Sequence, residues 1–233
     1  SVNGNVLASS TFDPATSIAG TYQYLLNSTS CGAIADRQFE IRISNDLPTV
    51  TSLVATSTSV CSGNSTTVTF NGSPDAVVTY QIDGGSNQTV TLSAGGTATI
   101  TGTYTADTTI NIVSVASSGT PSCVNPQTSS ITLTVLPLPT ASVAVSPTTI
   151  CANDSATFTF TGTPNATVTY NINGGANQTV VLDAAGTATL TGTYSANTKV
   201  NIVSVASAGT PSCVNPQPSS ITLTVLPLPT ASV

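Results

Sequence analysis

Hydrophobic side chains alternate with threonine and serine along most of the chain, and no stretch shows the spacing of a helix. In residues 61–139 the hydrophobic positions of these segments are Val68 and Phe70; Val78, Tyr80 and Ile82; Val90 and Leu92; Ala98 and Ile100; Ile110, Ile112 and Val115; and Ile131, Leu133 and Val135. A period of two predicts strands with one buried face. Turn-forming residues such as Asp83-Gly84-Gly85 separate the segments, and a bulge is expected near Ser114. Six or seven such strands predict an all-β, immunoglobulin-like β-sandwich.

The same pattern occurs twice. Residues 61–139 align without gaps on residues 151–229, an offset of 90, with 57 of 79 positions identical. Self-similarity of this kind indicates tandem domains. We therefore expect the C-terminal strands of a preceding immunoglobulin-like or PKD-like domain in 1–47, a first repeat in 48–138, a second repeat in 139–228, and the start of another repeat in 229–233.

A proline-rich segment marks the boundary between repeats. Residues 136–143, Leu-Pro-Leu-Pro-Thr-Ala-Ser-Val, return as residues 226–233. Alternate prolines lack N–H donors and fix φ near −65°, so such a segment is extended and stiff. The sequence thus predicts short, stiff connectors between β-sandwiches.

The composition narrows the functions that this fold can serve. Only 5% of the 233 residues are charged, with 3 Lys+Arg and no His, whereas 44 Thr and 31 Ser supply a hydroxyl-rich surface. Three basic residues cannot neutralise a phosphate backbone, which argues against nucleic-acid binding. No apolar run approaches the roughly 20 residues of a membrane span, and residues 1–5 do not resemble a signal peptide.

The acidic residues offer no shared site. Each acid of one repeat aligns with a different residue type in the other: Asp75 with Asn165, Asp83 with Asn173, Asp107 with Asn197, Asp154 with Asn64, and Asp183 with Ser93. Glycosidase-type catalysis requires two carboxylates facing one bond. We therefore expect no enzyme activity, no catalytic, cofactor-binding or metal-binding residues, and no cofactor. Calcium at the junctions is disfavoured because only residues 44–46 supply an acid there.

Five cysteines in so polar a chain indicate disulfides and an oxidising, extracellular compartment. Within each repeat the available partners lie 62 residues apart, which predicts Cys61–Cys123 and Cys151–Cys213 bonds that staple loops at the end of a sandwich. Cys31 is left over, and the same spacing would place its partner upstream of residue 1.

The repeat and its closing segment, Ser-Ser-Ile-Thr-Leu-Thr-Val-Leu-Pro-Leu-Pro-Thr-Ala-Ser, resemble the tandem domains of very large Bacteroidota cell-surface adhesins. The SprB-type gliding-motility adhesins, exported by type IX secretion, are the best-known group. Residues 11–24 together with Cys31 are similar to the closing strands of domains in those proteins. The resemblance implies a cell-surface location and O-glycosylation at Asp-Ser/Thr motifs, which makes Thr108 and Ser155 the candidate sites.

The favoured hypothesis is a structural stalk or filament segment that extends an adhesive or motility function from a bacterial surface. Its expected partners are neighbouring repeats in the same chain, with lateral self-association and surface glycans as further candidates. A glycan- or ligand-binding module is the alternative. It requires exposed aromatic side chains, and Tyr104 and Tyr194 are either exposed in this way or form a corner hydrogen bond, whereas Tyr80 and Tyr170 lie in the apolar phase. Accessory domains of a secreted enzyme form a third hypothesis.

Overall fold

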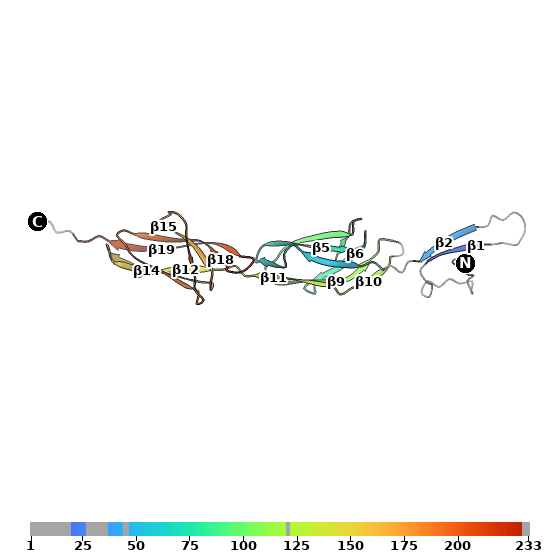
Figure 1. Cartoon of the computed structure of the whole chain (residues 1–233), viewed down its shortest axis with the longest axis horizontal. Helices are drawn as coiled ribbons and strands as arrows, with labels where there is room; N and C mark the ends of the chain where they lie inside the picture. Colours follow the sequence, from blue (N-terminus) through green and yellow to red (C-terminus); the bar gives the residue numbers. More distant parts are fainter. Residues whose placement is uncertain (1–19, 27–36, 44–46, 120–121, 230–233) are drawn as a thin grey trace, which may run out of the picture. The chain divides into compact units, whose positions relative to one another are not determined.

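The computed structural model describes residues 20–26, 37–43, 47–119 and 122–229, and every regular element among them is a β-strand (Figure 1). The all-β prediction is therefore confirmed. Strands β1 (Gly20–Leu26) and β2 (Arg37–Ile43) form an antiparallel pair. Cys31, residues 11–19 of the segment that resembles adhesins, and the weak calcium candidate at 44–46 lie outside the described residues.

Residues 50–136 form two sheets. The smaller has the strand order β3-β5-β8, with β3 at Val50–Ala55, β5 at Ser65–Gly72 and β8 at Thr97–Thr103. The larger has the order β4-β11-β9-β6-β7, with β4 at Ser59–Cys61, β6 at Val77–Ile82, β7 at Gln88–Thr91, β9 at Thr108–Ala116 and β11 at Ser130–Leu136. The short β10 (Val124–Pro126) also pairs with β9.

Residues 141–226 form a second pair of sheets with the same order. The smaller consists of β12 (Ala141–Ser146), β14 (Ser155–Gly162) and β17 (Thr187–Thr193). The larger runs β13 (Thr149–Cys151), β19 (Val214–Leu226), β18 (Thr198–Ala206), β15 (Thr167–Ile172) and β16 (Gln178–Val181). The β13–β19 pairing is parallel, whereas β18 and β19 are antiparallel.

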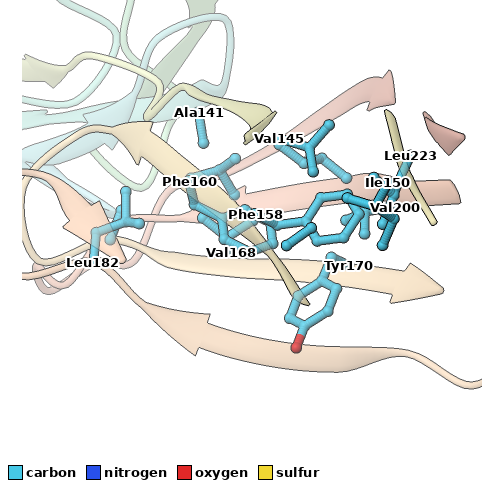
Figure 2. Packing of buried hydrophobic residues seen from close by; sticks show 14 residues of the cluster. Ala141, Val145, Ile150, Phe158, Phe160, Val168, Tyr170, Leu182, Val200 and Leu223 are labelled. Carbon is cyan, nitrogen blue, oxygen red and sulfur yellow. The ribbon is translucent and has the colours of Figure 1, made fainter. Parts of the chain in front are cut away.

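Within residues 50–136 and 141–226, most of the fully buried side chains lie at hydrophobic positions that the alternation predicts. Figure 2 shows Phe158 and Phe160 of β14 packed among side chains of the larger sheet, such as Val168, Val200 and Leu223. Complete burial of an aromatic side chain contributes about 1.5–3 kcal/mol. In the first set of sheets the corresponding side chains are also buried: Val68, Phe70, Val78, Ile110, Ile112, Val115 and Leu133.

Local irregularities follow the sequence as well. The hairpin after β6 turns at Asp83 and Gly84, whose φ angles are 51° and 68°, and the amide of Gly85 donates to the carbonyl of Ile82. Two consecutive left-handed residues are typical of a type I′ turn, which favours Asp-Gly and Asn-Gly. The register of β18 shifts between Ile202 and Ser204, next to the position equivalent to the expected bulge.

By compactness the chain divides into two units. The first holds residues 1–53, 69–98 and 111–130, and the second holds 54–68, 99–110 and 131–233. The division passes through β3, β5, β8, β9 and β11, so it does not follow the repeat boundaries expected from the sequence. Those boundaries stay a prediction.

Candidate functional site: the cysteine clamp and the linker anchor

A disulfide joins Cys61, the last residue of β4, to Cys213, which directly precedes β19. The two Cα atoms are 5.5 Å apart, and the cysteines have a sequence separation of 152. Both side chains are buried, and both residues belong to the second compact unit. Cys61 lies in the first copy of the repeated sequence and Cys213 in the second, so the bond covalently connects the two copies.

This bond corrects the pairing expected from the sequence, because Cys123 and Cys151 carry exposed thiols. The length of β19 gives the physical reason. Cys213 precedes the first residue of this 13-residue strand, whereas Cys151 pairs with its last residue, Leu226. At ~3.3 Å per residue the two cysteines of one repeat are ~40 Å apart, against a limit of ~7 Å between the Cα atoms of a disulfide.

Side-chain hydrogen bonds, called the linker anchor below, fix the start of each repeat to the sandwich of that repeat. The Asn215 Nδ2 donates to the carbonyl of Pro139 at 2.9 Å, and the Gln217 side chain accepts from the Ala141 amide and donates to its carbonyl. Near the first repeat, Asn125 donates in the same way to the carbonyl of Pro48 at 3.0 Å. The linker prolines Pro48 and Pro139 are buried. The connector is therefore anchored to the sandwich that follows it.

Sequence reasoning missed this anchor because Asn-Pro-Gln resembles an ordinary loop. Its recurrence at 125–127 and 215–217, at a constant distance from the linker, is the signal that could have found it.

Asp107 holds a backbone amide, and its charge is dispensable for that task. Its Oδ1 accepts from the Val135 amide at 2.6 Å, while the Asn197 Oδ1 accepts from the Val225 amide at 2.7 Å. An amide oxygen and a carboxylate oxygen satisfy the same donor. The aligned pairs Asp75/Asn165 and Asp83/Asn173 likewise share left-handed φ angles of 51–60°, which Asp and Asn both tolerate.

Asp183 closes a turn. Its Oδ1 accepts from the amides of Ala185 and Thr187, and its Oδ2 accepts from the Thr187 hydroxyl. The hydrogen bonds from the backbone and side chain of Thr187 hold the pKa of this carboxyl below its usual value. Ser93 Oγ makes the corresponding contact with the Thr97 amide. Within 47–119 and 122–229, no three His, Cys, Asp or Glu side chains form a group that could hold a metal ion.

The two candidate glycosylation residues differ in accessibility. The Thr108 side chain is 7% exposed, and its hydroxyl donates to the carbonyl of Ala106 at 3.0 Å. Ser155, the first residue of β14, is exposed. The folded protein thus offers Ser155, but not Thr108, to a glycosyltransferase, and modification at either residue stays a prediction.

The four tyrosines of residues 47–119 and 122–229 pack inward. Tyr80 and Tyr170 lie in the core, where each hydroxyl donates to a glutamine side chain of the neighbouring strand at 3.1 Å. Tyr104 is buried, contrary to the exposure that a binding module would require. Tyr194 packs edge-on against Phe158, and burial raises its pKa. Among residues 47–119 and 122–229, no aromatic side chain is exposed as a stacking surface for sugars.

In the part of the chain that the structure describes, no helix has the length and hydrophobicity needed to cross a bilayer.

Comparisons with known proteins give fold likeness only. No family model and no curated protein match the chain. It is similar to the structure of a Ca²⁺-stabilised adhesin that helps an Antarctic bacterium bind ice, at 20% identity and a TM-score of 0.47, and it covers 58% of that chain's length. The similarity to a 1.5-MDa bacterial ice-binding adhesin (19% identity, TM-score 0.44) covers 82% of this chain and 70% of the adhesin chain. The similarity to a C-terminal intimin fragment in complex with its receptor (16% identity, TM-score 0.40) covers 76% of this chain and 64% of the fragment. These similar structures are surface adhesins, and at such TM-scores they carry no functional argument.

Proposed function

We propose that this chain is a structural stalk segment of a repetitive extracellular adhesin, which holds an adhesive or motility function away from a bacterial surface. The observation that carries the proposal is the Cys61–Cys213 bond, because it joins one copy of the repeat covalently to the next. A module that only binds a ligand gains little from such a bond. In a load-bearing chain, the bond transmits tension directly from one repeat to the next.

The path of tension explains this gain. Force applied to the two ends passes along the backbone to Cys61, across the disulfide to Cys213, and on toward the C-terminal end. The residues between the two cysteines, whose sequence separation is 152, carry no load while the bond is intact. Most residues of both sandwiches are therefore shielded from direct extension.

The linker anchor acts at the same places. Hydrogen bonds from Asn125 to the Pro48 carbonyl and from Asn215 to the Pro139 carbonyl tie each stiff connector to the sandwich that follows it. Such anchoring limits the freedom of a connector, as a spacer requires. The proposal takes residues 48–138 and 139–228 as the repeated domains. It also takes an extracellular location, because disulfides persist in oxidising compartments.

Small-angle X-ray scattering on the oxidised chain tests the proposal. A compact protein of 233 residues has a radius of gyration of ~17 Å. A stalk segment is expected to exceed this value clearly and to keep the excess from low to high salt. A radius near that of a compact globule, with the repeats folded against each other, would defeat the proposal.

A further inference from the structure

The exposed thiol of Cys151 lies in an open hollow of about 470 Å³ at the end of β13. Its lining includes Thr149, Ile150, Cys151, Asp154, Ser155 and Leu226.

The equivalent surface of the first repeat is already occupied. Ser59, Val60, Cys61, Asn64 and Ser65 correspond, at the offset of 90, to five residues that line the Cys151 hollow. There Pro211 and Ser212 complete the lining, and the next residue, Cys213, is bonded to Cys61. In the first repeat, this surface thus binds the Pro211-Ser212-Cys213 segment.

The segment that contains Pro211, Ser212 and Cys213 occurs a second time in the sequence. Residues 119–123, Gly-Thr-Pro-Ser-Cys, are identical to residues 209–213. The Cys123 amide donates to Ser117 Oγ at 2.9 Å, and the Cys213 amide donates to Ser207 Oγ at the same distance. Cys123 is therefore held in the same local hydrogen bonding as Cys213, although its thiol is exposed and unbonded.

We propose that the Cys151 hollow is a docking and disulfide-bonding site for the Gly-Thr-Pro-Ser-Cys loop of another copy of the repeat. The loop that ends in Cys123, on a second copy of this chain, is such a loop and should form a Cys151–Cys123 bond there. The inference rests on the proposed function, since a stalk of many repeats gains a covalent bond at each junction that uses the same pair of cysteines. Bond formation requires an oxidant, for which a small-molecule disulfide such as oxidised glutathione suffices.

The reaction proceeds by two thiol–disulfide exchanges. The thiolate of Cys123 attacks oxidised glutathione, forms a mixed disulfide and releases one glutathione thiolate. The Cys151 thiolate then attacks the Cys123 sulfur of this mixed disulfide and releases the second glutathione. The two protein thiols lose two electrons and two protons, and one glutathione disulfide is reduced to two thiols.

The test uses the whole chain with Cys31→Ser, to remove the remaining cysteine, in a buffer of reduced and oxidised glutathione. Non-reducing electrophoresis should show a ladder of dimers, trimers and larger species that collapses on reduction. Peptide mass spectrometry should find Cys123 linked to Cys151 and Cys61 linked to Cys213. An equimolar mixture of the Cys123→Ser and Cys151→Ser variants should stop at the dimer, because one complementary pair remains.

A second variant separates docking from random oxidation. Ser155→Arg places a bulky charged side chain in the hollow and should slow the Cys123–Cys151 linkage by about tenfold or more. Thr179→Arg, on the exposed edge strand β16, is the matched control and should leave the rate unchanged. Equal yields of Cys123–Cys123, Cys151–Cys151 and mixed bonds, or no effect of Ser155→Arg, would overturn the inference. Small-angle X-ray scattering on the variant that carries both Cys123→Ser and Cys151→Ser, which cannot form this linkage, reports separately on the stalk function.

Discussion

Removal of the Cys61–Cys213 bond should lengthen the chain that force can extract from the folded protein. The perturbation is reduction of the disulfide, or the substitution Cys61→Ser. While the bond is intact, pulling on the two ends cannot extend the residues between the cysteines, because the covalent path bypasses them.

The expected gain can be calculated from the sequence separation. The bond hides 152 residue steps, and an extended chain spans at most ~3.5 Å per residue. Reduction should therefore add ~530 Å to the maximum extension. The distance across the bond itself, 5.5 Å between Cα atoms, is negligible by comparison.

Single-molecule force spectroscopy with handles at both ends measures this quantity. Cys31, Cys123 and Cys151 are replaced by serine in every variant, so that Cys61–Cys213 is the only disulfide that can form within the chain. The oxidised protein should show a short total extension, and the same molecules in reductant should show the additional length. Cys61→Ser should give the long extension without reductant. If oxidised and reduced molecules reach the same final extension, the shielding argument is refuted.

Three further predictions concern the anchor and the acids. Asn215→Asp keeps the shape of the side chain but removes the donor to the buried Pro139 carbonyl, and should lower the free energy of unfolding by ~1–3 kcal/mol in urea titrations; an unchanged midpoint would contradict the anchor. Asp107→Asn should change that free energy by less than ~0.5 kcal/mol, since Asn197 makes the same contact, whereas Asp107→Ala should cost ~1–2 kcal/mol; equal losses would show that charge matters. The pKa of Asp183 is lower folded than unfolded, so its stabilisation is complete above ~pH 4 and is lost as pH falls through the folded pKa; Asp183→Asn should flatten this acid limb in thermal melts, and an unaltered limb would exclude the assignment.

The strands and the core are predictable from the sequence because burial in a sandwich imposes a period of two. Val68, Phe70 and Leu133 alternate with Thr, and all three are completely buried. The turn at Asp83-Gly84 is predictable for a similar reason, since few residues tolerate consecutive left-handed angles. In both cases a local physical rule determines the structure.

The cysteine pairing depends on a distance that no local rule provides. Residues 214–220, Val-Asn-Pro-Gln-Pro-Ser-Ser, have the composition of a loop, and a loop there would let Cys213 turn back toward Cys151. Instead they continue into one strand that ends at Leu226, because Asn215 and Gln217 hold the linker and the strand pairs with β18. A sequence separation of 62 residues therefore corresponds to opposite ends of a sheet.

The scarcity of charge acquires a structural meaning from the outward faces of the sheets. The hydroxyls of Thr67 and Thr101 lie 2.8 Å apart across β5 and β8, and the equivalent Thr157 and Thr191 lie 2.9 Å apart across β14 and β17. Cross-strand pairs of this kind stabilise a sheet where other proteins place opposite charges. Hydroxyl pairs are not screened by salt, whereas exposed ion pairs are. The disulfide clamp and the amide anchor share this independence from ionic strength. Contacts that avoid charge at both the junctions and the surfaces should keep their strength as the salt concentration changes, which is the property required by the proposed role as a spacer.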